Sequence, residues 1–258
     1  AFQGLLRNPL AEPYVLGVSG GAALGATLAL VLGAGLLTMW GAAIVPIFAL
    51  VGGLFATLLV YAIANASGQL SGPSVLLAGV IVNSIAGSLI TFIKTLVSAS
   101  KAQELLFWLM GFLDVPSVFA LSSVAFYVLL GSCVLIADSA RMNLLSLGDD
   151  SASHLGVNVG SLEKRVYLAA SLIVGAIVSV TGLIGFVGLV VPHAVRRLVG
   201  PDHRLVLPLS LFGGACMLVL CDLVARLAFL FLGTEPPVGA VTALVGGPLF
   251  LFLLAKRA

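Results

Sequence analysis

Long apolar runs that do not alternate with polar residues set the strongest limit on the fold of this chain. Of its 258 residues, 60% are hydrophobic and 9% are charged. A helix crosses a bilayer core of about 30 Å with about 20 apolar residues, and only helices and closed barrels satisfy their backbone polar groups in lipid. The runs lack the alternation of barrel strands. The sequence therefore predicts an all-α, polytopic transmembrane helical bundle and excludes a soluble domain.

About eight membrane segments are expected. They cover residues 15–37, 41–64, 73–97, 116–137, 162–181, 182–192, 205–232 and 237–255. Segment 182–192 is too short to cross alone at about 1.5 Å per residue, so we expect a short, partly buried element with its ends covered by neighbours. Residues 1–6 are expected to be the tail of a truncated helix. The apolar run around Trp108 is too short to span, so residues 98–115 are expected to form a helix on the membrane surface.

Small residues predict a close helix contact in the first segment. Gly17, Gly21 and Gly25 recur at four-residue spacing, which is typical of helices whose backbones approach each other in lipid. Because residues 1–6 are expected to be the tail of a truncated helix, this glycine face is predicted to miss at least one packing partner.

Charge placement predicts the orientation. When the segments alternate across the bilayer, nine of the 12 basic residues fall on one side, which the positive-inside rule assigns to the cytoplasm. Those nine are Arg7, Arg141, Lys164, Arg165, Arg196, Arg197, Arg204, Lys256 and Arg257. The remaining three, Lys94, Lys101 and Arg226, lie towards the other face.

The longest polar interruption runs from Asn143 to Arg165. Its first residues read as a short helical turn stopped by Gly148, and Asp149 or Asp150 can cap a second short helix that runs to Gly156. Two interpretations stay open on this pattern alone. The segment is either a solvated loop between membrane helices or a two-helix docking element for a water-soluble partner.

No motif for catalysis is present. The chain lacks a glycine loop followed by Lys-Ser/Thr, a His-Glu-x-x-His pattern and a nucleophile elbow, so we do not expect an enzyme. Three histidines lack carboxylates or thiols at ligand spacing and are expected to be structural, with no metal site: His154, His193 and His203. Three cysteines fall in apolar segments and are expected to be buried free thiols: Cys133, Cys216 and Cys221.

One ion pair is predicted inside a membrane segment. Asp222 and Arg226 are four residues apart, so a helix places them on one face. Charges within a span are costly and tend to be functional. The pair either ties helices together internally or presents Arg226 at the outer surface, because its long side chain can reach the interface.

Residues 182–204 read GLIGFVGLVVPHAVRRLVGPDHR, which resembles the signature of the FecCD family of ABC transporter permeases, importers of iron-siderophores, haem and cobalamin. Leu183 stands where the family more often has proline. Four other stretches resemble family positions in family order, at residues 7–19, 77–83, 147–157 and 237–248.

The resemblance implies a single permease domain over residues 1–258, in a family whose members have ten membrane helices. The chain would then begin near the end of the second. Residues 98–115 would be a periplasmic surface helix, and residues 143–160 would be cytoplasmic coupling helices that dock into a cleft of an ATPase subunit. The ATPase-coupling residues implied are Leu147, Gly148, Asp149, Asp150, Ser151, His154, Leu155 and Gly156. Arg226 would receive glutamates of a substrate-binding protein.

The function implied by the resemblance is a permease subunit of a binding-protein-dependent ABC importer in the cell inner membrane, with a cytoplasmic C-terminus. It would move an iron chelate, haem or cobalamin, and the residues do not encode which. The expected partners are a second copy of the chain, two ATPase subunits that bind ATP and Mg, a periplasmic substrate-binding protein and lipid; no nucleic acid and no cofactor in this chain are expected. The alternative is an ion-coupled secondary transporter, which would need mid-membrane carboxylates, and only Asp222 is expected to lie deep enough.

Overall fold

The computed structural model describes residues 1–9, 11–32, 41–66, 72–114 and 117–255, and within these ranges the chain is helical with no strand. The all-α prediction is therefore confirmed. The helices are α1 (Phe2–Leu5), α2 (Val18–Val31), α3 (Gly41–Ala64), α4 (Gly72–Leu96), α5 (Ala99–Met110), α6 (Val118–Ala137), α7 (Ser139–Leu145), α8 (Asp149–His154), α9 (Val159–Thr181), α10 (Val187–Val199), α11 (His203–Leu232) and α12 (Val238–Ala255).

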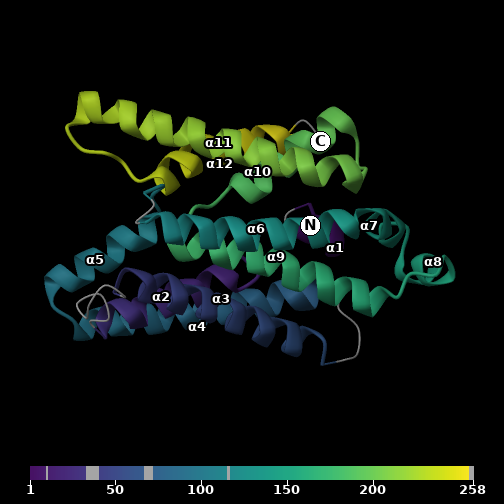
Figure 1. The fold of residues 1–258 in the computed structure, drawn as a ribbon, viewed down its shortest axis with the longest axis horizontal. Helices are drawn as coiled ribbons and strands as arrows, with labels where there is room; N and C mark the ends of the chain where they lie inside the picture. The colour runs from purple at the N-terminus through teal and green to yellow at the C-terminus, as the bar shows by residue number, and fades with distance from the viewer. Residues whose placement is uncertain (10, 33–40, 67–71, 115–116, 256–258) are drawn as a thin grey trace.

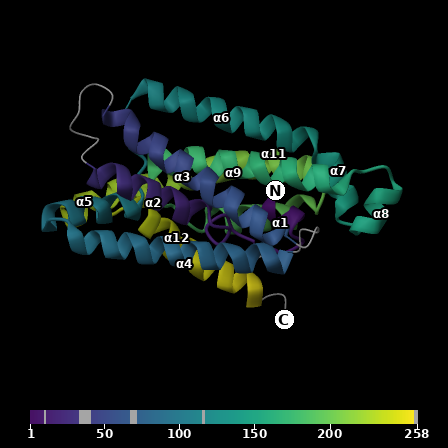
Figure 2. The ribbon, with the colours of Figure 1, turned by 90° about the horizontal axis from the view of Figure 1, so that it is seen from below.

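Most of the long helices run side by side along the longest axis of the molecule (Figure 1). Helices α10, α11 and α12 form one layer, α6 and α9 lie next to it, and α2, α3 and α4 lie beyond them. A view turned by 90° places α6 on one side of the bundle and α4 and α12 on the other (Figure 2). Helix α8 projects from one end of the bundle, and α5 lies at the opposite end.

Five helices in the described ranges are long and apolar enough to cross a membrane: Ile44–Ala64, Gly72–Leu96, Val118–Ala137, Val159–Thr181 and His203–Phe231. These confirm five of the expected segments. Two shorter apolar helices, Val18–Val31 and Val238–Phe250, lie in the first and last expected segments. Residues 33–37 of the first expected segment lie outside the described residues.

The expected short element at residues 182–192 is wrong in its boundaries. Residues 182–186 are not helical, and α10 begins at Val187 and continues past Pro192 to Val199. The break falls where it does because Gly182 and Phe186 both have positive φ angles, of 69° and 68°, which a right-handed helix does not allow. Pro192 is tolerated inside the helix, as prolines often are in membrane bundles where neighbouring groups satisfy the freed carbonyl.

The glycine face of α2 packs directly on α3. A Cβ atom added to Gly25 would overlap the carbonyl oxygen of Phe48, and one added to Gly21 would overlap that of Gly52. The predicted close contact is thus confirmed. The prediction that this face misses a partner is wrong for these glycines, because α3 covers them.

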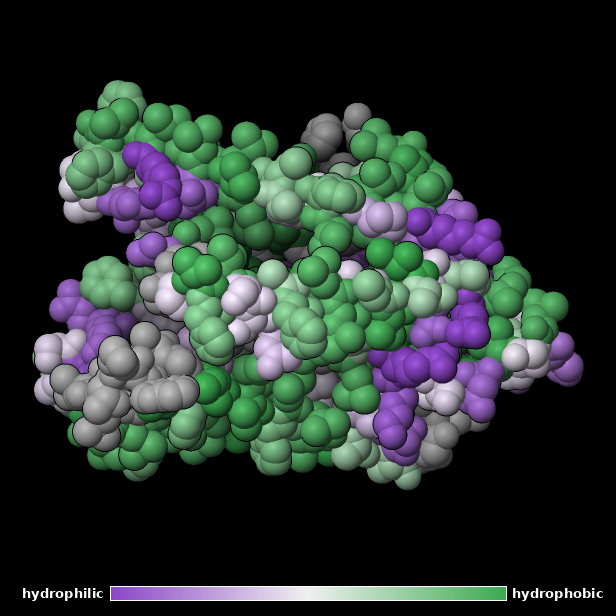
Figure 3. Space-filling view, viewed as in Figure 1, coloured by the Kyte–Doolittle hydropathy of each residue, from purple (hydrophilic) through white to green (hydrophobic). Residues whose placement is uncertain are grey.

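Polar side chains gather at the two ends of the bundle and hydrophobic ones cover its middle (Figure 3). The basic residues with described ion pairs follow the predicted separation: Arg7, Arg141 and Arg165 pair with acids near α7 and α8, and Lys101 and Arg226 pair at the other end. Lys256 and Arg257 lie outside the described residues.

The cysteines differ in their surroundings. All three are free thiols, and Cys221 is buried as expected. The expectation of burial is wrong for Cys133 and Cys216, because they lie on exposed faces of α6 and α11. The membrane-length windows of these two helices are each only 11% buried within the bundle, so most of their side chains face outward.

Candidate functional site

Helices α7 and α8 form a compact projection, here called the knob, which covers residues 139–157. The knob extends beyond the ends of the long helices (Figures 1 and 2). Its first helix, α7, begins at Ser139, four residues before the predicted start at Asn143. The reason is that Asp138 is both the C-cap residue of α6 and the N-cap residue of α7, so the two helices follow each other directly. Two short helices joined by a glycine elbow were predicted in this segment, and the structure has them.

The elbow itself is a backbone conformation that requires glycine. Gly148 precedes α8 with φ 113° and ψ 154°, a region that is essentially restricted to glycine. Gly156, after α8, also has a positive φ of 82°. The N–H groups of Gly156 and Val157 return to the carbonyl oxygens of Ser153 and Ala152 at 3.0 Å each, so the second helix is closed at its C-terminal end.

The prediction that Asp149 or Asp150 caps α8 is wrong. The N-cap residue is Gly148, and no side chain caps this helix. Both aspartates lie within the first turn, where a negative charge is favoured by the helix dipole. The carboxylate of Asp149 instead pairs with the guanidinium of Arg7, so the segment that follows α1 supports the knob. The second helix ends at His154 rather than Gly156.

The knob has a buried inner side and an exposed outer side. Met142, Leu145 and Ala152 are each 1% exposed or less. Leu147 and Leu155 are 64% and 58% exposed. The structure brings the predicted coupling residues together on this outer side, where all are exposed except half-buried Gly148: Leu147, Gly148, Asp149, Asp150, Ser151, His154, Leu155 and Gly156. Exposed leucines beside carboxylates make a small mixed surface suited to a protein partner.

The base of the knob is tied to α9 by a buried carboxylate. Asp138 is 3% exposed and accepts hydrogen bonds from Arg165 Nε and Nη2 at 3.0 and 3.1 Å. Arg141 Nη1 donates to the same carboxylate at 2.6 Å. Two-point pairing of a guanidinium with a carboxylate fixes direction as well as distance. These hydrogen bonds join the residue that precedes α7 to α9.

A second tie joins the knob to the start of α11. Asn143 Nδ2 donates to Asp202 Oδ1 at 2.6 Å, and Asn143 Oδ1 accepts from the backbone N–H of His203 at 2.9 Å. Asp202 also caps α11 by accepting from the N–H of Arg204 at 2.9 Å. The hydrogen bond from Asn143 and that from the Arg204 backbone lower the pKa of the Asp202 carboxyl below its ordinary value. α11 then runs without a break to the other end of the bundle.

At that other end, α11 carries the predicted ion pair. Arg226 Nε donates to Asp222 Oδ2 at 2.8 Å, so the four-residue pairing is confirmed. The Arg226 side chain is 55% exposed and that of Asp222 is 20% exposed. An internal pair and a surface cation are both compatible with this geometry, because one guanidinium edge is engaged and much of the group is open.

The predicted structural histidines have protein surroundings rather than metal-ligand neighbours. His154 Nδ1 lies 2.8 Å from the carbonyl oxygen of Asp150, and His203 Nδ1 lies 2.8 Å from Asn143 Oδ1. His193 is buried edge-on against the ring of Phe250. Among the described residues, no three His, Cys, Asp or Glu side chains are grouped so as to hold a metal ion.

One interior carboxylate was not anticipated. Glu12 Oε1 accepts from the N–H of Phe186 at 2.9 Å, at the start of α10. The prediction considered Asp222 alone and left out Glu12, which contacts the backbone of Phe186. Glu12 sits between two prolines in a segment that reads as a surface loop, and its partner is 174 residues away, so no local pattern could indicate it.

The fold and its polar ends define a multi-pass helical membrane protein with a two-helix knob at one end. A family model, described as the FecCD transport family, matches residues 1–256, and the chain belongs to this family.

Named relatives and a solved structure agree with this assignment. The chain is 42% identical to the cobalamin import system permease protein BtuC of Halobacterium salinarum, over 99% of this chain and 66% of that protein. It is 37% identical to the hemin transport system permease protein HmuU of Yersinia pestis, over 99% of this chain and 75% of the relative. A solved metal-chelate-type ABC transporter in an inward-facing conformation matches with a TM-score of 0.88 and 33% identity, over 98% of this chain and 79% of that chain. The chain therefore spans about two thirds to three quarters of the length of these relatives.

Proposed function

We propose that this chain forms the membrane-spanning permease part of an ABC importer that moves an iron chelate, haem or cobalamin across the inner membrane. ATP and Mg would be bound by a partner ATPase subunit, so the chain itself would be neither an enzyme nor a cofactor carrier. The single observation that carries the proposal is the knob, whose exposed outer side projects from the bundle while its base is tied to α9 and α11. The names of the relatives, both transport permeases, support the transport role.

Energy would enter through the knob. An ATPase subunit that closes on ATP would push on the outer side of α8, and the ties through Asp138 and Asn143 would pass that push to α9 and α11. A rigid-body switch of this kind needs a partner that binds the two conformations with different affinity. The knob would then lie on the cytoplasmic side, as would the C-terminal end of α12.

The transport path would lie between two copies of this chain. Helix α4 has an 18-residue membrane window that is only 28% buried, and its exposed face carries Ser84, Ser88 and Thr91. Each of these hydroxyls bonds a carbonyl oxygen one turn earlier, at 2.8 to 2.9 Å. A stripe of small, internally satisfied hydroxyl groups suits a smooth passage and does not select one chelate.

An ion-coupled carrier finds no support in the contacts of the interior acids. Glu12 accepts a backbone N–H, and Asp222 is paired with Arg226. A carboxylate that exchanges an ion needs alternating access to water or to that ion.

Docking at the knob is tested by its two exposed leucines. Replacing both Leu147 and Leu155 with glutamate in the full transporter is expected to lower the affinity for the ATPase subunit at least tenfold. The reason is that burial of each leucine side chain at the contact is expected to contribute about 1.5 to 3 kcal/mol to the binding free energy. Co-purification and titration of the ATPase against the permease measure the loss. Lys164→Glu, at an exposed position of α9 near the same end, is the control for added negative charge. Equal ATPase affinity in the double variant and the wild type would rule out this docking surface.

Docking at the opposite end is tested by Arg226. Arg226→Glu is expected to weaken binding of the substrate-binding protein by about tenfold at low ionic strength, with a smaller effect at high salt. Arg226→Lys keeps the charge and should retain most of the affinity. Asp222→Asn removes the internal pair while leaving the cation, so it should bind like the wild type. If Asp222→Asn weakened binding as much as Arg226→Glu, the pair would be internal rather than a docking group.

A further inference from the structure

Two non-helical segments of the chain meet in the middle of the bundle. One is the loop that joins α1 to α2, and the other is residues 182–186, which precede α10. A Cβ added to Gly188 would lie 3.5 Å from the ring of Pro13, so the loop rests against the first turn of α10. Unwound backbone at membrane depth is tolerated only where protein or a water-filled cavity surrounds it.

The depth of this meeting point follows from the neighbouring helices. A Cβ on Gly214, near the centre of α11, would lie 3.7 Å from Val187. Gly246 and Gly247, near the centre of α12, face the ring of Phe186. Asn83, in the middle of α4, donates its side-chain amide to the carbonyl oxygen of Tyr14. Three helices thus contribute their central residues to one junction.

Phe186 is the strained member of this junction. It is the N-cap residue of α10 with φ 68° and ψ −28°, and aromatic residues rarely adopt positive φ. Its N–H donates to Glu12 Oε1 at 2.9 Å. The carboxylate lies at the N-terminal end of α10, where the helix dipole favours a negative charge. Glu12 therefore stabilises both the unusual backbone at Phe186 and the start of the helix.

The other side of Phe186 determines how close α12 can approach. A Cβ added to Gly246 would lie 2.6 Å from the Cβ of Phe186 and 3.2 Å from its Cγ, so only glycine fits there. The ring of Phe186 also packs with Leu189, Val190 and Phe250 in one apolar cluster. A change in the Phe186 backbone would therefore displace α12.

The loop also connects this junction to α4. A Cβ on Gly79 would overlap the carbonyl oxygen of Val15, so α4 and the loop are in backbone contact there. Together with the bond from Asn83 to Tyr14, a continuous set of contacts runs from α4 through the loop and Glu12 to Phe186 and α12. Helices α4 and α12 lie on the same side of the bundle (Figure 2).

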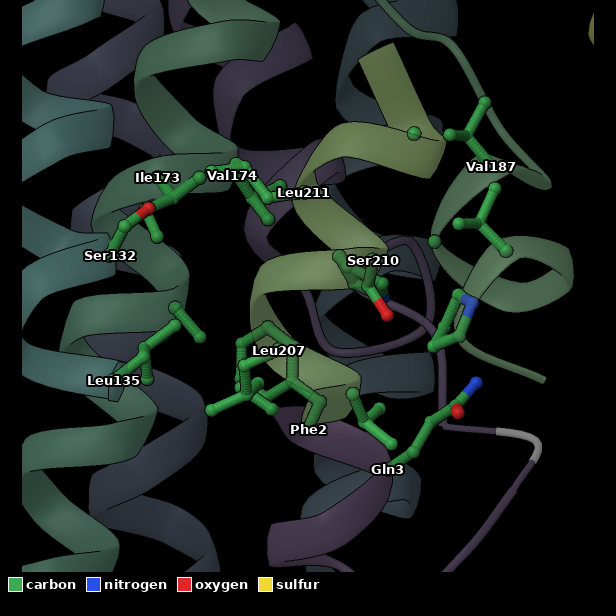
Figure 4. Close-up of a pocket in the computed structure, with 18 of the residues that line it drawn as sticks. Phe2, Gln3, Ser132, Leu135, Ile173, Val174, Val187, Leu207, Ser210 and Leu211 are labelled. Carbon is green, nitrogen blue, oxygen red and sulfur yellow. The ribbon is translucent and has the colours of Figure 1, made fainter. Parts of the chain in front are cut away.

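A cavity lies beside the junction formed by the loop and residues 182–186. A cavity of about 230 Å³ between α6, α9 and α11 is lined mainly by apolar side chains, among them Phe2, Leu135 and Leu207 (Figure 4). Pro13 and Gly188 border this cavity, so the loop contacts the cavity at Pro13 and α4 at Val15.

We propose that Glu12 is a positioning residue, which holds Phe186 in its left-handed conformation and thereby sets the spacing of α12 from α4. The link from this spacing to transport rests on the proposed function, in which α4 borders the path. Loss of the acceptor at residue 12 would release Phe186 towards ordinary backbone angles and let α12 move.

The spacing is measured directly with spin labels at Ser88→Cys in α4 and Leu244→Cys in α12, in full-length permease from which the native cysteines have been removed. Glu12→Leu has similar volume and no acceptor, and it is expected to shift and broaden the distance distribution. The lost charge-assisted hydrogen bond corresponds to a change of about tenfold to hundredfold in the ratio of molecules with Phe186 in its left-handed conformation to those without it. Glu12→Gln keeps an acceptor oxygen and should retain the wild-type peak. Glu104→Leu removes an exposed carboxylate of α5 and is the matched control.

A comparison of double variants distinguishes the proposed positioning of Phe186 by Glu12 from general destabilisation of the fold. Glycine adopts positive φ readily, so in a Phe186→Gly background the step from Glu12 to leucine should change the spacing much less than in the wild type. If Glu12→Leu leaves the spacing unchanged, if Glu12→Gln shifts it as much as Glu12→Leu, or if the effects add independently of Phe186, the proposal is overturned. Where Glu12→Leu does not yield folded protein, Glu12→Asp, whose shorter side chain cannot reach the same N–H, takes its place with the same expectation. The distances are measured without ATP or ATPase. They therefore test whether Glu12 sets the spacing of α12 from α4 even if the wild-type transporter shows no uptake.

Discussion

Gly148→Val is expected to abolish coupled uptake while leaving the permease folded in the membrane. Valine at φ 113° and ψ 154° is forced into a backbone region essentially restricted to glycine, at a cost of about 1 to 3 kcal/mol, so α8 should swing out of its position rather than keep the elbow. Space does not oppose the substitution, because among the described residues only Ser151 Oγ, at 4.0 Å, lies near an added Cβ. The effect would therefore come from backbone conformation alone.

The measurement is substrate transported per ATP hydrolysed by the reconstituted full transporter, with thermal stability of the permease recorded in parallel. Gly160→Val is the matched control: Gly160 is exposed near the same end, no described residue comes within 4 Å of an added Cβ, and its φ is not positive. The control should transport at close to the wild-type ratio. Wild-type coupling in Gly148→Val would show that the shape of the knob does not matter.

Gly25→Leu is expected to prevent stable folding of the permease. An added side chain would meet the backbone carbonyl of Phe48 in α3, and a backbone group cannot rotate away as a side chain can. Overpacking commonly costs about 1 to 3 kcal/mol, and we expect about 3 kcal/mol or more here because α2 and α3 would have to separate along their contact.

The yield of monodisperse protein and its melting temperature in detergent measure this effect. Gly87→Leu in α4 is the control, since an added Cβ there meets no described residue within 4 Å, and the melting temperature of this variant should match the wild type. Comparable stability of Gly25→Leu and Gly87→Leu would contradict the packing described for α2 and α3.

Features set by local pattern were predictable from the sequence. Residues 41–64 and 73–97 were expected as spans and form α3 and α4 to within a residue, because uninterrupted apolar length is what a helix needs in lipid. Gly148 was expected at an elbow because it interrupts a short helical pattern, and the structure places it there with positive φ. The ion pair of Asp222 and Arg226 follows from helical spacing.

Features set by distant partners were not predictable. Asp149 or Asp150 was expected to be a cap, but neither is, and Arg7, which is 142 residues from Asp149, pairs with the Asp149 carboxylate. Asn143 lies in a stretch with many polar residues, and the sequence does not distinguish it from them. Only the folded chain shows that it forms hydrogen bonds with Asp202 and His203. The start of α10 at Val187 depends on the positive φ of Phe186, which a residue of that type does not signal.

The proposed function requires that ATP drives import through the knob. Uptake into proteoliposomes that hold the full permease and the ATPase, with binding protein and loaded chelate outside and ATP inside, tests it most directly. We expect accumulation that requires both ATP and the binding protein and that is lost in Gly148→Val but kept in Gly160→Val. Accumulation driven by an ion gradient without ATP would contradict the claim.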